Sequence, residues 1–132
     1  MSTLSGAFNP KLDEKGRIIL PARLREYFVN GLVMTRGQDG CLLVFTAAAF
    51  EVRAEALATA PLTNLEARNY VRMFMSGAHS ETPDKQGRVT IPVALRQYAS
   101  LTRELTVIGA GNHAEIWDAA KWAAFESSQE FN

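Results

Sequence analysis

Two copies of one short motif carry the residues of this sequence that could do chemistry. The motif is Asp-x-x-x-Arg with a glycine before the arginine, and it runs from Asp13 to Arg17 and from Asp84 to Arg88. An arginine guanidinium is a planar fork that can form two hydrogen bonds with a guanine edge. A neighbouring carboxylate can hold such an arginine extended. The motif is therefore compatible with a DNA contact, and also with a structural Asp–Arg salt bridge across a turn.

Catalytic and metal-binding patterns have little support elsewhere in the chain. His79 and His113 are isolated histidines, and neither stands at metal-ligand spacing with Cys41 or a carboxylate. A small enzyme that uses Asp13 or Asp84 as a general base is an alternative, but no polar triad or metal set accompanies these residues. We therefore expect no enzyme activity, no metal, no cofactor and no small-molecule substrate.

The motif belongs to an internal repeat. Residues 6–27 match residues 77–98 without a gap. The identical pairs are Gly6/Gly77, Ala7/Ala78, Asp13/Asp84, Gly16/Gly87, Arg17/Arg88, Pro21/Pro92, Leu24/Leu95, Arg25/Arg96 and Tyr27/Tyr98. The match continues loosely through Phe45/Trp117 and Phe50/Trp122. This density of identities indicates a true duplication.

Each repeat predicts the same series of short elements. The Asp-x-x-Gly segment is a turn pattern, because aspartate can bond its own backbone and glycine can take a positive φ. A strand follows at 17–20 or 88–91, and then a proline at the first position of a short helix that ends near residue 28 or 100. Hairpin strands are predicted at 32–35 and 41–45, and at 105–108 and 114–117. Helices follow at 47–58 and 119–127, with Thr46 and Asp118 as N-caps.

These elements predict a mainly β fold with short helices (α+β). Between the repeats, residues 63–66 (Thr-Asn-Leu-Glu) predict a capping box that begins a helix ending near Ser76. One repeat has only a few short strands and helices, which are too little to bury a sufficient core alone. We therefore expect the repeats to interleave into one closed barrel with a pseudo-twofold axis. Repeat 1 is expected at 5–50, a connecting helical segment at 51–75 and repeat 2 at 76–125, with Trp117 and Trp122 as packing residues.

Composition and charge narrow the class of protein. The 132 residues suffice for one domain, and their net charge of zero counts against a simple basic nucleic-acid binder. The charge is uneven, however: residues 11–25 carry five basic and two acidic side chains, whereas residues 104–132 carry one basic and five acidic ones. The single cysteine fits a reducing cytoplasm. No apolar run approaches a membrane span and residues 1–6 do not resemble a signal peptide, so we expect a soluble, intracellular protein.

The two motifs, each followed by an aliphatic strand, a proline and a helix containing Leu-Arg, resemble the MraZ family. The similarity runs from about Ser5 to Phe125, and two motif copies inside a repeat make it specific. The resemblance implies two tandem AbrB-like units in a swapped-hairpin barrel, assembled into ring-like homo-oligomers. It also implies a nucleoid-associated regulator that binds short direct repeats of double-stranded DNA. Those repeats lie in its own promoter, that of the cell-division and cell-wall gene cluster, where it acts as a repressor.

The resemblance also assigns residues to the DNA site. The signature arginines Arg17 and Arg88 are its DNA contacts, while the loops are shaped by Asp13, Asp84, Gly16 and Gly87. Weaker DNA-contact candidates are the basic positions around them: Lys11, Lys15, Lys85 and Arg25. The loops differ at Glu14/Lys85 and Lys15/Gln86, so equal contacts with DNA are not required of them.

The main alternative is an AbrB-type antitoxin or another protein-interaction module. Such a protein uses the same fold for DNA and an extra tail for a toxin. The second repeat speaks against this alternative, and so does the expectation that no long disordered tail follows residue 125. The neighbouring genes would separate the two hypotheses most cheaply.

Overall fold

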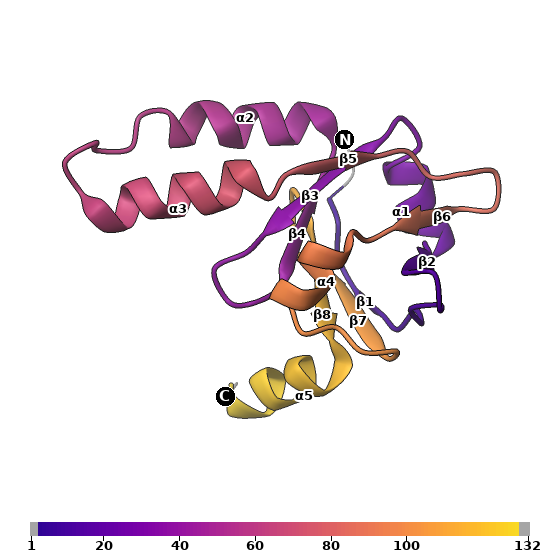
Figure 1. Cartoon of the computed structure of the whole chain (residues 1–132). Coiled ribbons are helices and arrows are strands. Elements are labelled where there is room, and N and C mark those ends of the chain that lie inside the picture. Colours follow the sequence, from indigo (N-terminus) through magenta and orange to yellow (C-terminus); the bar gives the residue numbers. More distant parts are fainter. Residues whose placement is uncertain (1–2, 130–132) are drawn as a thin grey trace.

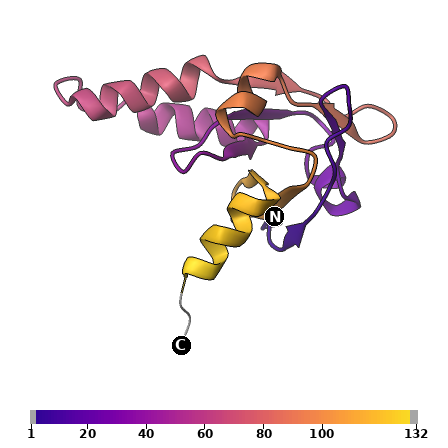
Figure 2. The ribbon, with the colours of Figure 1, turned by 60° about the horizontal axis from the view of Figure 1, so that its bottom comes forward.

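The computed structural model describes residues 3–129, which form eight strands and five helices. Their order is β1 (Ala7–Phe8), β2 (Arg17–Ile19), α1 (Ala22–Tyr27), β3 (Leu32–Arg36), β4 (Leu42–Phe45), α2 (Ala47–Leu57), α3 (Leu65–Ser76), β5 (His79–Glu81), β6 (Arg88–Thr90), α4 (Val93–Tyr98), β7 (Leu105–Gly109), β8 (Ala114–Asp118) and α5 (Ala119–Ser128). The α2–α3 hairpin and α5 project away from the strands (Figures 1 and 2). The expected α+β class with short helices is confirmed.

Six strands form one antiparallel sheet in the order β1-β7-β8-β4-β3-β5. Strands of different repeats are neighbours three times in this order: β1 pairs with β7, β8 with β4, and β3 with β5. Exchanging the two repeats reverses the order onto itself, because β1 corresponds to β5, β7 to β3 and β8 to β4. Each repeat therefore completes the sheet of the other.

The remaining strands, β2 and β6, form a separate two-stranded antiparallel ribbon. Within the described residues, β1 and β5 end the large sheet and no pairing joins them, so the expected single closed barrel is not confirmed. These two strands are only two and three residues long, which leaves few ladder hydrogen bonds for closure. Short edge strands also limit unwanted pairing with other chains.

The core occupies both faces of the central strands. Along β4, Leu42 and Val44 face one cluster and Leu43 and Phe45 face another, because successive side chains of a strand alternate. The first cluster lies between the sheet and the β2–β6 ribbon with α1 and α4. The second lies under α2, α3 and α5 and includes the fully buried Phe74. The β2–β6 ribbon is thus fixed to the sheet by a packed apolar layer.

The two tryptophans belong to this second apolar layer. Trp117 is buried at the end of β8, and the Trp122 ring packs against it with centroids 5.3 Å apart. Phe45 and Phe50 form the matching edge-to-face pair in the first repeat, at 6.1 Å. The prediction that the tryptophans are packing residues is confirmed.

Two of the three predicted helix starts have the expected N-cap residue. Thr46 caps α2 as predicted, since its Oγ1 accepts from the N–H of Ala49 at 3.1 Å. The predicted capping box is wrong, because the N-cap of α3 is Asn64, one residue later than Thr63. Asp118 is the N-cap residue of α5 as predicted, and its carboxylate accepts two hydrogen bonds from Thr102.

Candidate nucleic-acid interface

The first motif loop, residues 13–17, is a compact turn organised by the Asp13 carboxylate. Its Oδ1 accepts from the backbone N–H groups of Lys15 at 2.8 Å and Arg17 at 2.9 Å. Its Oδ2 accepts from Nε of Arg17 at 3.0 Å. Gly16 has φ +79°, and its N–H donates to the carbonyl of Asp13 at 3.0 Å. One carboxylate thus fixes both the turn and the direction in which the arginine leaves it.

The second motif loop, residues 84–88, repeats this geometry bond for bond. Oδ1 of Asp84 accepts from the backbone N–H groups of Gln86 and Arg88, each at 2.9 Å. Its Oδ2 accepts from Nε of Arg88 at 2.8 Å, and Gly87 has φ +76°. The expected loop-shaping aspartates and glycines therefore stand where such a turn needs them.

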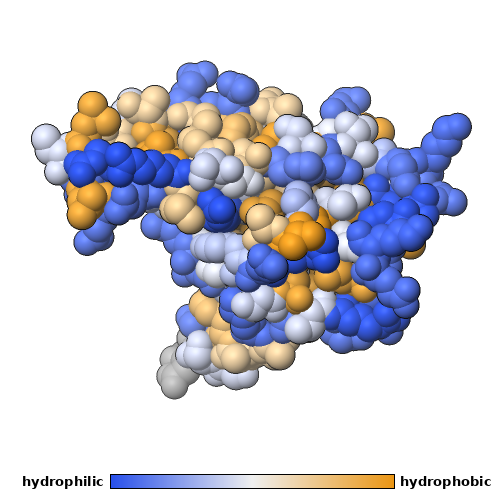
Figure 3. Space-filling view, viewed as in Figure 1, coloured by the Kyte–Doolittle hydropathy of each residue, from blue (hydrophilic) through white to orange (hydrophobic). Residues whose placement is uncertain are grey.

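The β2–β6 ribbon brings the two loops together. Arg17 pairs with Thr90 and Ile19 pairs with Arg88, so the loops begin at opposite ends of a three-residue antiparallel ladder. The two arginines are offset by two residues along the ribbon, roughly 7 Å of strand. Both loops lie on the side of the molecule away from the α2–α3 hairpin, and hydrophilic residues cover that side (Figures 1 and 3).

Each signature arginine is held through the Nε of its guanidinium, while the two terminal nitrogens of that group remain accessible. In the hydrogen bonds recorded for residues 3–129, the side chains of Arg17 and Arg88 donate through Nε alone. Their terminal nitrogens remain for an outside acceptor, on side chains that are 29% and 32% exposed. The edge made by the two terminal nitrogens can donate together to O6 and N7 of a guanine or to a phosphate.

The aspartates are held in their ionised form. Hydrogen bonds keep the pKa of Asp13 below its ordinary value, above all the bond from the backbone N–H of Arg17. The pKa of Asp84 is lowered in the same way by Arg88. A carboxylate that already accepts three hydrogen bonds and has a lowered pKa is a weak proton acceptor. The geometry therefore argues against a general base at either position.

Comparison with known proteins places the chain in a family. The MraZ family model, described as "MraZ protein, putative antitoxin-like", matches residues 3–73 and again residues 73–132. Over 125 residues the chain is 54% identical to a protein of Micrococcus luteus, 58% to one of Paenarthrobacter aurescens and 56% to one of Leifsonia xyli. Each of these relatives is named Transcriptional regulator MraZ, and each alignment covers 95% of this chain and 87% of the relative.

The chain belongs to the MraZ family. The resemblance drawn from the two motifs is confirmed, and the family model matches once over each motif loop.

In this MraZ chain, Arg25 is an exposed residue of α1 whose guanidinium also makes contacts within the protein. Its guanidinium lies against Gly87 of the second loop, and its Nη2 donates to the carbonyl of Leu20 at 3.0 Å. Arg96 occupies the equivalent place against Gly16 of the first loop. Arg96 is absent from the residues predicted for the site, although the identical pair Arg25/Arg96 in the repeat could have indicated it.

The side chains of the three predicted lysines lie around the loops, and among the described residues they make no hydrogen bond within either loop. Lys15 and Lys85 are exposed within the first and second loop. Lys11 stands just before the first loop, and its Nζ lies 4.0 Å from Glu104 in a pair whose side chains are 59% and 60% exposed. Such an exposed pair contributes about 0–1 kcal/mol to stability and leaves the lysine able to exchange partners.

The histidines have carboxylate partners that sequence spacing did not suggest. Nε2 of His79 lies 2.9 Å from Glu81, and Nε2 of His113 lies 3.3 Å from Glu115. The bond with His113 is the main reason that the pKa of Glu115 is lowered. Over residues 3–129 no three His, Cys, Asp or Glu side chains are grouped so that they could hold a metal. The first pair lies beside the β2–β6 ribbon, since Oε2 of Glu81 accepts from the backbone N–H of Thr90 at 3.5 Å. The second pair lies at the β7–β8 hairpin.

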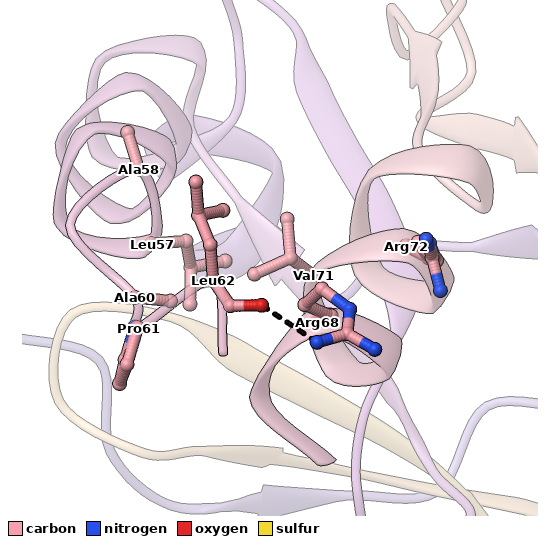
Figure 4. A pocket seen from close by; sticks show the side chains of 8 residues that line it. All are labelled: Leu57, Ala58, Ala60, Pro61, Leu62, Arg68, Val71 and Arg72. Atoms are coloured by element: carbon pink, nitrogen blue, oxygen red, sulfur yellow. Dashed lines mark hydrogen bonds between the residues drawn. The ribbon is translucent and has the colours of Figure 1, made fainter. Parts of the chain in front are cut away.

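A hollow between the end of α2 and α3 is a second candidate site (Figure 4). It has a volume of about 270 Å³ and is lined by Leu57, Ala58, Ala60, Pro61, Leu62, Arg68, Val71 and Arg72. Arg68 closes one side by donating to the carbonyl of Leu62 at 2.6 Å. The lining has two arginines but no carboxylate, histidine or cysteine, so it offers no acid–base or nucleophilic group.

None of the described helices has the length and apolar character of a membrane span.

Proposed function

We propose that this MraZ-family protein is a sequence-specific transcriptional regulator that binds double-stranded DNA through its two motif loops. The relatives in M. luteus and P. aurescens carry the name transcriptional regulator. The observation that carries the proposal is the pair of loops, each of which holds an arginine by Nε and leaves its terminal edge open. This role requires no catalytic residue, cofactor, metal or small-molecule substrate.

The two kinds of basic residue have different tasks in the proposal. Arg17 and Arg88 read base edges, because their orientation is fixed by a carboxylate and a fixed fork can discriminate guanine. Lys11, Lys15 and Lys85 contact phosphates, since flexible ammonium groups add affinity without sequence information. Arg17→Lys should therefore fail as well as Arg17→Ala, because an ammonium cannot reproduce the two parallel hydrogen bonds.

Several subunits must act together in this proposal. The two loops of one chain carry little net charge, so the affinity of a single subunit should be weak and strongly salt-dependent. We propose a ring-like homo-oligomer that binds tandem direct repeats in its own promoter, that of the cell-division and cell-wall gene cluster, and represses it. Each subunit would consist of units 5–50 and 76–125, joined by 51–75, with the protein associated with the nucleoid. Joining the subunits can raise avidity by about 10²–10⁴.

An AbrB-type antitoxin or protein-interaction module is the second candidate. The description of the family model contains the words antitoxin-like. The surface of the α2–α3 hairpin also exposes Val52, Leu62 and Leu65, which a protein partner could cover. A toxin would be expected as the product of a neighbouring gene and would copurify with the protein.

The experiment is a titration with DNA from upstream of the protein's own gene. Wild type should bind this DNA and not a scrambled sequence, whereas Arg17→Ala and Arg17→Lys should lose most of this preference and keep their unfolding temperature. Two tandem boxes should bind at least about tenfold better than one, and a half-turn insertion should remove most of that gain. Equal binding of upstream and scrambled DNA, or wild-type binding by Arg17→Ala, would reject the proposed function.

A further inference from the structure

One arginine of each repeat reaches the motif loop of the other repeat. Arg25 lies on α1 of the first repeat, yet a Cβ added to Gly87 of the second loop would stand 2.6 Å from its Cζ. Arg96 lies on α4 of the second repeat, and a Cβ added to Gly16 of the first loop would stand 2.7 Å from its Cζ. Each guanidinium therefore occupies the space that any other residue in place of the glycine would need.

One side-chain and one backbone hydrogen bond connect each arginine to the glycine that it covers. Nη2 of Arg25 donates to the carbonyl of Leu20 at 3.0 Å, while the N–H of Leu20 donates to the carbonyl of Gly87 at 2.8 Å. In the mirror arrangement, Nε of Arg96 donates to the carbonyl of Ile91, and the N–H of Ile91 donates to the carbonyl of Gly16, both at 2.8 Å. An arginine and a strand end of one repeat thus hold the glycine of the other.

The held glycine directly precedes the signature arginine. Gly16 and Gly87 are buried, although residues 14, 15, 85 and 86 of the same loops are exposed. A shift of Gly16 moves the backbone N–H of Arg17, which is one of the three donors to the Asp13 carboxylate. Loss of the covering arginine would therefore loosen the whole turn and the direction of its DNA-contacting side chain. Ordering a loose loop at binding lowers affinity.

We propose that Arg25 and Arg96 are positioning residues that act in trans, each holding the DNA-contact loop of the opposite repeat. The proposal rests on the proposed function, because it concerns the same two loops. It predicts a crossed dependence: Arg96 supports Arg17, and Arg25 supports Arg88. A direct phosphate contact by Arg25 or Arg96 would produce no such pairing.

The first test measures the loops without DNA. The Nε–H signals of Arg17 and Arg88 can be followed by ¹H–¹⁵N NMR in the full chain, and their bonds to Asp13 and Asp84 make each signal a reporter of one loop. Arg96→Ala should move the Arg17 signal and leave the Arg88 signal in place, and Arg25→Ala should do the reverse. Arg23→Ala is the matched control, because it removes a charge from α1 at a residue that contacts Ser5 and no loop glycine. Signals that move equally in both loops, or in neither, would overturn the proposal.

The second test is a pair of double-mutant cycles on DNA affinity. At low salt, Arg96→Ala should weaken binding about five- to tenfold in wild type and in Arg88→Ala, but have little effect in Arg17→Ala. Arg25→Ala should show the opposite dependence. A phosphate contact would instead lower affinity by the same factor in both backgrounds, because residual nonspecific binding also depends on phosphates. Equal factors would therefore overturn the positioning role.

Lysine variants of Arg25 and Arg96 show whether the charge or the planar shape of the guanidinium matters. They also replace an alanine variant that fails to fold. Arg25→Lys and Arg96→Lys keep the charge but lose the planar group that covers the glycine. They should bind DNA as weakly as the alanine variants, and full binding by the lysine variants would overturn the proposal. If Arg17→Ala and Arg88→Ala themselves bind as wild type, the proposed function fails, and the NMR test still decides whether the crossed contacts hold the loops.

Discussion

The two motif loops share one backbone and differ in charge. Residues 13–17 and 84–88 make the same five hydrogen bonds within the turn, with the same left-handed glycine. Between the aspartate and the glycine, however, one loop carries Glu14 and Lys15 and the other carries Lys85 and Gln86. Only the backbone N–H of the second middle residue takes part in the turn, so its side chain is free to vary.

Different residues of the loops determine their backbone geometry and their local charge. Aspartate, glycine and arginine define the geometry that both loops keep, whereas the middle positions set the local charge that DNA phosphates meet. The second loop is the more basic of the two, by one unit of charge. We therefore expect the loops to aim their arginines alike and to differ in the salt dependence of their contacts.

Separating the repeats should have the largest effect, because neither loop has its supports within one repeat. In a fragment of residues 1–58, only the β3–β4 pairing remains, since β1, β2 and β4 pair with strands of the second repeat. The fragment should be disordered, or should dimerise by pairing two copies. Circular dichroism and light scattering would measure this, and a monomer that unfolds cooperatively would contradict it.

Filling the loop glycines should have the next largest effect and should treat the loops alike. Gly16→Ala and Gly87→Ala introduce a Cβ that meets Arg96 or Arg25 and also force alanine into a left-handed conformation. Gly111→Ala is the matched control, because its φ is +94° and nothing lies within 4 Å of the added Cβ. The conformational cost alone is about 1–2 kcal/mol. A guanidinium that moves aside also loses its bond to the carbonyl of Leu20 or Ile91. Chemical denaturation should therefore show a larger loss for the loop variants than for Gly111→Ala, and equal losses would mean that the arginine moves aside without cost.

Acid should weaken both loops in the same pH range. The pKa of Asp13 and of Asp84 is lowered in the folded protein, so the ionised carboxylates favour folding above their ordinary pKa of about 4. That contribution is lost as the pH falls through the lowered values. The unfolding temperature of wild type should therefore fall more steeply than that of Asp13→Asn/Asp84→Asn between about pH 5 and pH 3. Parallel curves for the two proteins would contradict it.

Exchanging the middle charges should have the smallest effect. Lys15→Gln makes the first loop resemble the second at this position, and Gln86→Lys does the reverse. Neither change should alter the unfolding temperature, and each should change the slope of log affinity against log salt by about one unit. Salt titrations of DNA binding would measure this. A loss as large as that of Arg17→Ala would instead place Lys15 among the base contacts.

The sequence predicted the local elements well because their signals are local. The turn, the prolines before α1 and α4, and the glycine-rich hairpins each depend on a few adjacent residues. The duplication also predicted that the repeats share one sheet. It could not predict β1 and β5, whose two or three residues show no periodicity, nor that the sheet stays open at these strands.

The sequence predicted the residues of the motif loops better than the residues that hold these loops in place. Asp13, Arg17 and their equivalents follow from the motif alone. The role of Arg25 against Gly87 depends on a contact between residues 62 positions apart, which no local pattern reveals. The Asp118–Thr102 bonds, which hold the N-cap residue of α5, are a further contact that only the folded chain brings together.

The most direct test of the central claim is to measure, on one DNA, the affinity of wild type, Arg17→Ala, Arg88→Ala and the double variant. The DNA carries two upstream direct repeats, and a scrambled DNA of equal length and composition is the reference. Each lost bidentate contact should cost about 1–3 kcal/mol of discrimination, and an oligomer multiplies that loss over its subunits. The account predicts that each single variant loses most of its preference for the direct repeats, that the double variant shows no preference between the DNAs, and that all four proteins unfold at nearly the same temperature. Wild-type preference in either single variant, or unfolding of the variants, would contradict the claim that both loops contact DNA.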